Sequence, residues 1–243
     1  MKKRLISLII LSTLTLAGCG NSTDTTTNDT NTAKNDTTIT SDSKTSPYIT
    51  QDVAITNSDD ALARLKDGNN RFYNNESKLI NVTGERRDQL TDGQEPYAVV
   101  VSCSDSRVTP TTVFNVGLGE IFDIRIAGNV VDSDALGSIE YGVEHLHSPL
   151  IVVMGHEKCG AVTAAYDKVK NGTPVEGNIN AIVDKIQPNI NDADSLDEAI
   201  RDNTDAVKDQ IQNDEIVKKL IDEGKVKIVE AHYSLDGKVT FDE

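Results

Sequence analysis

Four short runs of β-branched residues constrain the fold more than any other feature of the sequence. Two of these runs contain V-V-V and L-I-V-V with no polar residue between the apolar ones. Strands of this kind are covered on both faces, as in parallel sheets that lie between layers of helices. The four runs cover residues 97–102, 121–127, 150–154 and 226–231.

Helical patterns alternate with these runs. Their apolar residues recur three and four positions apart, which is the spacing of one face of an α-helix. The patterns cover residues 59–72, 85–90, 134–146, 161–169, 179–190, 196–211 and 216–221. Strands that alternate with helices predict an α/β fold, in which helices flank a mostly parallel central sheet.

The charge balance of the chain bears on its partners. The 243 residues include 39 Asp and Glu against 24 Lys and Arg, a formal net charge of -15. A nucleic-acid partner needs a basic surface that neutralises phosphates. The acidic balance therefore argues against nucleic acid and suits a small neutral substrate better than a polyanion.

Residues 1–18 have the features of an export signal. M-K-K-R is basic, the apolar stretch after it is too short to span a membrane comfortably, and small residues end it. The run Leu16-Ala17-Gly18-Cys19 resembles the lipobox of bacterial lipoproteins. That resemblance implies that Cys19 is lipidated and becomes the mature N-terminus. In the alternative interpretation the signal is an ordinary cleaved one, and Cys19 has no role.

The composition of residues 19–46 predicts a disordered tether, which begins with the lipidated Cys19. From residue 21 onward they are almost entirely Thr, Asn, Asp, Ser and Lys. Such a segment buries too little apolar surface to offset the entropy of ordering it. A single catalytic domain is then expected over residues 47–243. The acyl chains on Cys19 would attach this domain to a bacterial membrane outside the cytoplasm, with no other contact to the membrane.

Two short polar motifs follow two of the predicted strands. The sequence S-C-S-D-S-R at 102–107 places Cys103 directly after the first strand, and G-H-E-K-C at 155–159 places His156 and Cys159 after the third. Parallel sheets bind their ligands outside the carboxyl ends of the strands. Both motifs therefore meet at one edge of the sheet if their strands are neighbours.

The residues of the two motifs are compatible with three kinds of site. In an exported protein, Cys103 and Cys159 could form a disulfide. Cys103 could instead be a nucleophile with His156 as its base. Two cysteines and one histidine also provide the three ligands of a catalytic zinc site, which leaves one coordination position open. Cys159 begins a helical pattern, where the helix dipole stabilises a thiolate for either of the last two roles.

The neighbours of Cys103 favour a catalytic or metal-binding role over a disulfide. A disulfide would not explain why an Asp and an Arg follow the cysteine after two and four residues. Asp105 is a proton acceptor close to the predicted site. Arg107 can hold its carboxylate through a charge-assisted bidentate pair.

These motifs resemble those of the beta-class carbonic anhydrases. C-S-D-S-R at 103–107 is similar to the C-x-D-x-R motif of that family, and H-E-K-C-G-A-V at 156–162 is similar to its H-x-x-C segment. Either half is weak alone, whereas the pair about 50 residues apart on strands is specific. Further similarity lies at 65–72, 117–129, 138–143 and 231–241.

The resemblance implies the composition of a site. Cys103, His156 and Cys159 would bind one Zn²⁺ per chain, and Asp105 with Arg107 would form the catalytic pair. Asp105 has two postures in the family, either paired with Arg107 or bound to zinc as a fourth ligand in an inactive form. In some relatives a glutamine at the position of Gln94 binds bicarbonate, and the alternative for Gln94 is an exposed loop residue.

The resemblance also implies an activity and an assembly. The expected reaction is the zinc-dependent reversible hydration of carbon dioxide to bicarbonate and a proton, in a homodimer or a larger assembly of dimers. One alternative is a related zinc hydrolase that acts on carbonyl sulfide or carbon disulfide. Another is a catalytically inactive lipoprotein that binds bicarbonate or zinc, or whose two domain cysteines form a disulfide.

Overall fold

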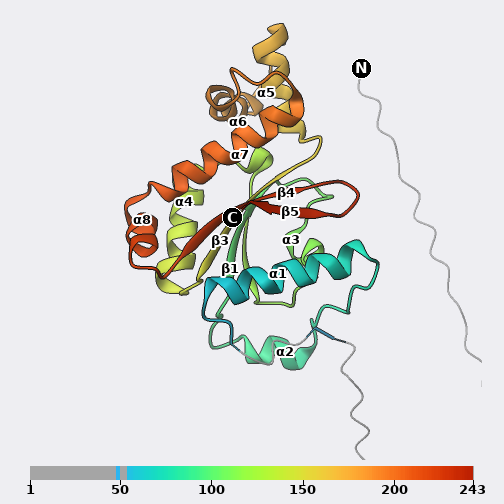
Figure 1. Ribbon diagram of the computed structural model, residues 1–243, viewed down its shortest axis with the longest axis vertical. Helices are drawn as coiled ribbons and strands as arrows, with labels where there is room; N and C mark the ends of the chain where they lie inside the picture. The colour runs from blue at the N-terminus through green and yellow to red at the C-terminus, as the bar shows by residue number, and fades with distance from the viewer. Residues whose placement is uncertain (1–47, 50–53, 243) are drawn as a thin grey trace, which may run out of the picture. The chain divides into compact units, whose positions relative to one another are not determined.

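A five-stranded sheet forms the centre of the part of the chain that the structure describes (Figure 1). This computed structural model describes residues 48–49 and 54–242. The strands are β1 (Ala98–Ser102), β2 (Ile121–Arg125), β3 (Leu150–His156), β4 (Lys227–Tyr233) and β5 (Val239–Asp242). Their order is β2-β1-β3-β4-β5; the first four run parallel, and β5 pairs antiparallel with β4. The predicted mostly parallel sheet is confirmed.

Helices cover both faces of this sheet. They are α1 (Ser58–Tyr73), α2 (Gly84–Gln89), α3 (Pro110–Val113), α4 (Ser133–Glu140), α5 (Gly160–Asn171), α6 (Ile179–Ile186), α7 (Leu196–Gln212) and α8 (Glu215–Asp222), with the short turns η1 (Ala127–Asn129), η2 (Tyr141–His145) and η3 (Gln187–Asn189). On one face, α1 and α3 pack against strand residues that include Val100 and Val152. On the other face, α4, α7 and α8 pack against strand residues that include Val99 and Val153.

This two-sided packing explains the uninterrupted apolar runs. Successive strand residues point to opposite faces of a sheet, so the positions of β1 and β3 are apolar or small where helices cover both faces, up to His156 at the end of β3. All five residues of β1 and all seven of β3 are buried. A third apolar cluster lies where α5, α6 and α7 meet, and it includes Cys103 and Cys159. The two cysteines are thus part of the packed interior.

Three elements end earlier than their sequence patterns indicate, and one of them is α6, which ends at Ile186 although its pattern extends to residue 190. The apolar run 121–127 leaves the sheet after Arg125 and enters η1, in which Gly128 has a φ of 68°. The helical pattern 134–146 forms α4 and then continues only as the π-helical turn η2. The first of these turns has a role in the site described below.

The predicted signal peptide (1–18), the lipidation site Cys19 and the predicted tether (19–46) lie outside the described residues. Among the helices that the structure does describe, none combines the length and the apolar character that crossing a membrane requires.

Candidate metal centre

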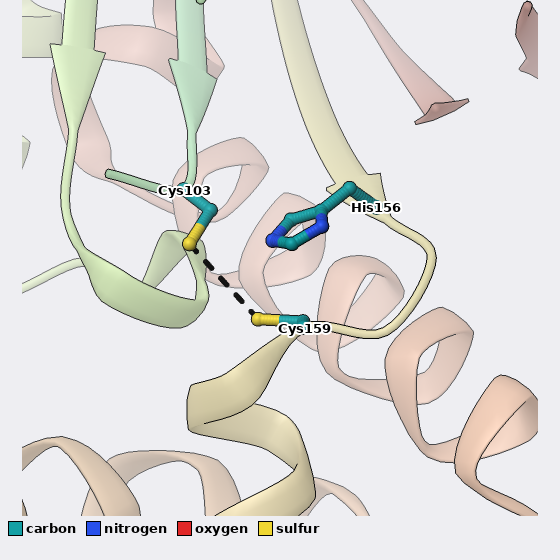
Figure 2. A group of neighbouring side chains, drawn as sticks. All are labelled: Cys103, His156 and Cys159. Atoms are coloured by element: carbon teal, nitrogen blue, oxygen red, sulfur yellow. Dashed lines mark hydrogen bonds between the residues drawn. The ribbon is translucent and has the colours of Figure 1, made fainter. Parts of the chain in front are cut away.

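Cys103, His156 and Cys159 come together at the carboxyl edge of the sheet. β1 and β3 are direct neighbours with Ser102 opposite Met154, so their ends deliver Cys103 and His156 to the same place. Cys159 is the N-cap residue of α5, three residues after His156. Figure 2 shows the three side chains directed toward one another from two strand ends and a helix start. Their potential ligand atoms all lie within 4.8 Å of one another, so the group could hold one metal ion.

The histidine ring presents an unprotonated nitrogen to this group. Nδ1 of His156 lies 2.9 Å from the carbonyl oxygen of Glu157. Because a carbonyl oxygen only accepts hydrogen bonds, Nδ1 carries the proton in the neutral ring, and the lone pair of that tautomer is on Nε2. Nε2 is buried and has no hydrogen-bond partner among the described residues. Buried polar atoms are nearly always paired, so this unpartnered nitrogen has the position of a metal ligand.

The two sulfurs are free thiols and not a disulfide. Their Sγ atoms lie 4.0 Å apart, about twice the length of an S–S bond. The hydrogen bond from the Cys159 thiol lowers the pKa of Cys103 while burial opposes the shift, so a thiolate forms on Cys103 first. Cys103 is 5% exposed, His156 0% and Cys159 1%. Two buried sulfurs and one imidazole nitrogen are a donor set that suits Zn²⁺.

Asp105 pairs with Arg107 in this structure. Nε and Nη2 of Arg107 donate to Oδ1 and Oδ2 of Asp105 at 2.9 and 2.7 Å, and the backbone N–H of Arg107 donates to Oδ1 at 2.9 Å. The guanidinium holds the pKa of Asp105 well below its usual range. Asp105 is not a member of the group of clustered ligand atoms. Of the two postures that the resemblance allows, the structure has the one in which Asp105 rests on Arg107.

Comparison with known proteins identifies the family. The sequence model of a protein family described as "Carbonic anhydrase" matches residues 98–239, which is more than half of the chain. The chain belongs to the carbonic anhydrase family. The matched region contains both motifs, from Cys103 to Cys159, and extends through β4 to the start of β5.

Two mycobacterial relatives show how far the similarity extends. "Carbonic anhydrase 2" of Mycobacterium tuberculosis is 43% identical over 135 residues, which are 56% of this chain and 65% of the relative. "Carbonic anhydrase" of Mycolicibacterium smegmatis is 45% identical over 130 residues, which are 54% of this chain and 63% of the relative. The alignments thus span slightly less than two thirds of the length of these relatives.

Solved structures show the same fold. The Coccomyxa beta-carbonic anhydrase in complex with acetazolamide has a TM-score of 0.57 and 25% identity, over 63% of this chain and 74% of that one. A tetrameric beta-carbonic anhydrase from Sordaria macrospora has a TM-score of 0.58 and 24% identity, over 64% of this chain and 84% of that one. The α/β fold of this carbonic anhydrase family member is therefore that of the beta class.

Arg125 and Gly128 contact the site but were not predicted as site residues. Nε of Arg125 donates to the carbonyl oxygen of Cys103 at 3.2 Å, and its Nη2 donates to that of Asp105 at 2.7 Å. The N–H of Gly128 donates to Sγ of Cys103 at 3.3 Å. A sequence signal did exist, because Arg125 is a charged residue inside the apolar run 121–127. Arg125 lies opposite Ser102 in the sheet, and its guanidinium therefore reaches the backbone carbonyls of the segment that follows β1.

Gln94, the predicted bicarbonate-binding residue, lies apart from this group. It is exposed and lines a pocket of about 510 Å³ together with Arg86, Gln89 and Gly119, among others. None of the three potential metal ligands lines that pocket. Within the single chain, the structure therefore does not bring Gln94 together with the metal group, and its role stays a prediction.

The contacts of Arg125 predict a weaker metal site when its guanidinium is removed. Arg125→Leu leaves the carbonyls of Cys103 and Asp105 without these donors, so the segment that carries both side chains loosens. We expect zinc affinity to fall about 10-fold, as is typical when groups that orient ligands are lost. Competition with a chromogenic chelator measures this affinity.

Arg86→Leu is the matched control for this substitution. Nε and Nη2 of Arg86 also donate to a backbone carbonyl, that of Leu118, but remote from the metal group. Zinc affinity should be unchanged in this variant. Equal zinc affinity in both variants and the native protein would show that Arg125 does not position the site.

Proposed function

We propose that the protein catalyses the reversible hydration of carbon dioxide to bicarbonate and a proton, with one zinc ion held by Cys103, His156 and Cys159. The observation that carries the proposal is the convergence of two sulfurs and an unpartnered imidazole nitrogen beside a carboxylate held by arginine. Membership of the carbonic anhydrase family and the named mycobacterial relatives support the same reaction. When bound, zinc would supply the Lewis acidity that makes water a nucleophile near neutral pH.

Asp105 is the group that accepts a hydrogen bond from the reacting water. Its Oδ1 accepts two hydrogen bonds from Arg107, whereas Oδ2 accepts one. Each oxygen of an ionised carboxylate can accept about two hydrogen bonds, so Oδ2 retains an acceptor position. Because Arg107 keeps the carboxylate ionised, Asp105 orients the water through Oδ2 and does not compete with it as a proton donor.

The surroundings of the sulfurs suit a small neutral substrate. Cys103 and Cys159 belong to an apolar cluster that also contains Val130, Val162 and Ala165. Bulk water is kept from these donors, and electrostatic interactions are stronger in such an environment. An apolar surrounding of this kind places no charge requirement on the substrate, which is compatible with carbon dioxide.

The role of Asp105 predicts that turnover and metal content can be separated. Asp105→Asn removes the anionic acceptor but none of the three ligands. We expect the full-length variant to retain about one zinc per chain, while kcat for carbon dioxide hydration falls by about 100-fold or more, the usual contribution of a positioned acid or base. Metal analysis and stopped-flow hydration assays measure the two quantities.

Asp67→Asn serves as the control. Asp67 also pairs with an arginine, Arg71, but on the surface of α1. This variant should have native activity and native zinc content. A native protein that is folded and free of zinc would contradict the proposed function, and an Asp105→Asn variant with full activity would contradict the role of Asp105.

We also propose that the protein is a lipoprotein attached outside the cytoplasm to a bacterial membrane through Cys19. The support is the basic start, the short apolar stretch and the Leu16-Ala17-Gly18-Cys19 run of the sequence. Cys19→Ser should abolish acylation, because the thiol that carries the lipid is lost, and should move the protein to the soluble fraction. Mass spectrometry of the N-terminus and cell fractionation test this, and an acylated Cys19→Ser protein is the contrary result.

A homodimer, or an assembly of dimers, completes the proposal. The Sordaria macrospora relatives are described as tetrameric, which supports an assembly of this kind here. The mass of the purified protein in solution tests it, and a monomer at micromolar concentration would contradict it.

A further inference from the structure

The sulfur of Cys103 accepts a hydrogen bond from the backbone N–H of a glycine in an unusual conformation. Gly128 has φ 68° and ψ 22°, and its N–H lies 3.3 Å from Sγ of Cys103. A Cβ at this position would lie 2.7 Å from Cδ1 of Ile186 and 3.1 Å from Cβ of Ala161. A hydrogen bond from an N–H group to a ligand sulfur reduces the charge that the sulfur donates to a metal. The direction of the Gly128 N–H therefore bears on the properties of the metal site.

Glycine alone does not fix that direction. It adopts positive and negative φ values about equally well, so the left-handed conformation of Gly128 needs a restraint from its surroundings. The restraint is a buried side chain on α7, because Nδ2 of Asn203 donates to the carbonyl oxygen of Gly128 at 2.9 Å. The peptide groups on both sides of Gly128 are then held, one by Asn203 and the other by the sulfur.

Asn203 is itself held in place from two sides. Its side chain is 0% exposed, and its Oδ1 accepts a hydrogen bond from Nδ2 of Asn189 at 3.1 Å. The next residue, Thr204, lies against β3 so closely that a Cβ on Gly155 would come within 2.2 Å of its Oγ1. Since Gly155 directly precedes His156, α7 is fixed to the same strand that provides the histidine of the metal group.

We propose that Asn203 is a positioning residue for the metal centre, acting through Gly128 on the sulfur of Cys103. The inference rests on the proposed function, because it takes Cys103 as a metal ligand. The side chain of Asn203 hydrogen-bonds to Asn189 and Gly128, and not to the three potential ligands or to Asp105. Its effect is on the strength and the electronic character of one metal–sulfur bond.

The test replaces zinc by Co²⁺, whose thiolate charge-transfer absorption reports on the metal–sulfur bond. Asn203→Leu keeps the branched shape and the number of heavy atoms of the side chain but removes the donor to Gly128. We expect the charge-transfer band of the full-length protein to shift. We also expect the protein to lose its metal to a chelator about 10-fold faster, which is the lower end of the effects that follow when residues hydrogen-bonded to metal ligands are replaced.

Gln210→Leu is the matched control, because Nε2 of Gln210 donates from the same helix to the carbonyl of Val131 at 3.3 Å. It breaks a contact between α7 and the segment after η1 without touching Gly128. Its cobalt spectrum and its rate of metal loss should be those of the native protein. If Asn203→Leu behaves like Gln210→Leu while the native protein binds cobalt, the positioning role is wrong and the metal site stands. If the native protein binds no cobalt, the proposed metal site itself is contradicted.

A measurement on the native protein covers the case in which Asn203→Leu does not fold. In protein loaded with ¹¹³Cd, the Gly128 amide proton should show a scalar coupling to the metal through Sγ of Cys103. A coupling supports the hydrogen bond on which the proposal depends. Its absence, with the amide signal assigned, overturns the proposal.

Discussion

The parallel pairing of β1 with β3 is the constraint on which the rest of the site depends. Parallel strands end at the same edge of a sheet, so their pairing brings Cys103 and His156 together across 53 positions of sequence. That pairing is stable because helices bury both faces of the two strands, and apolar burial contributes roughly 25 cal/mol per Å². The position of the metal group at the edge of the sheet therefore depends on the buried apolar residues of β1 and β3.

The same burial makes the group of ligand atoms suited to a cation. An unsatisfied buried polar group costs about 1–3 kcal/mol, and Nε2 of His156 is such a group among the described residues. Two thiolates 4.0 Å apart would repel each other, and a cation between them would offset that repulsion. A metal held by these three residues would satisfy the nitrogen and offset the charge of both thiolates, which would couple metal binding to folding stability. The polar contacts from Arg125 and Gly128 then hold the backbone and one sulfur in place.

Much of this could be predicted from the sequence, because the signals were local. The apolar runs gave β1 and β3, and the motifs after them gave the three potential ligands and the pair of Asp105 with Arg107. The posture of Asp105 could not be predicted. The same sequence is compatible with a side-chain rotamer that pairs with Arg107 and with one that binds the metal. Arg125 and Asn203 were missed because each acts through a backbone group of a distant segment, 20 or more residues away in sequence. In the sequence alone, a polar residue of an amphipathic helix, such as Asn203 of α7, has the pattern of an ordinary exposed residue.

X-ray absorption spectroscopy at the zinc edge of the purified full-length protein tests the central claim most directly. The account predicts about one zinc per chain with two sulfur neighbours at about 2.3 Å, one imidazole nitrogen at about 2.0–2.1 Å and one light-atom position for water or substrate. A zinc spectrum without a sulfur shell, or with four sulfurs, would contradict it, because Cys103 and Cys159 provide the two thiols of the proposed site.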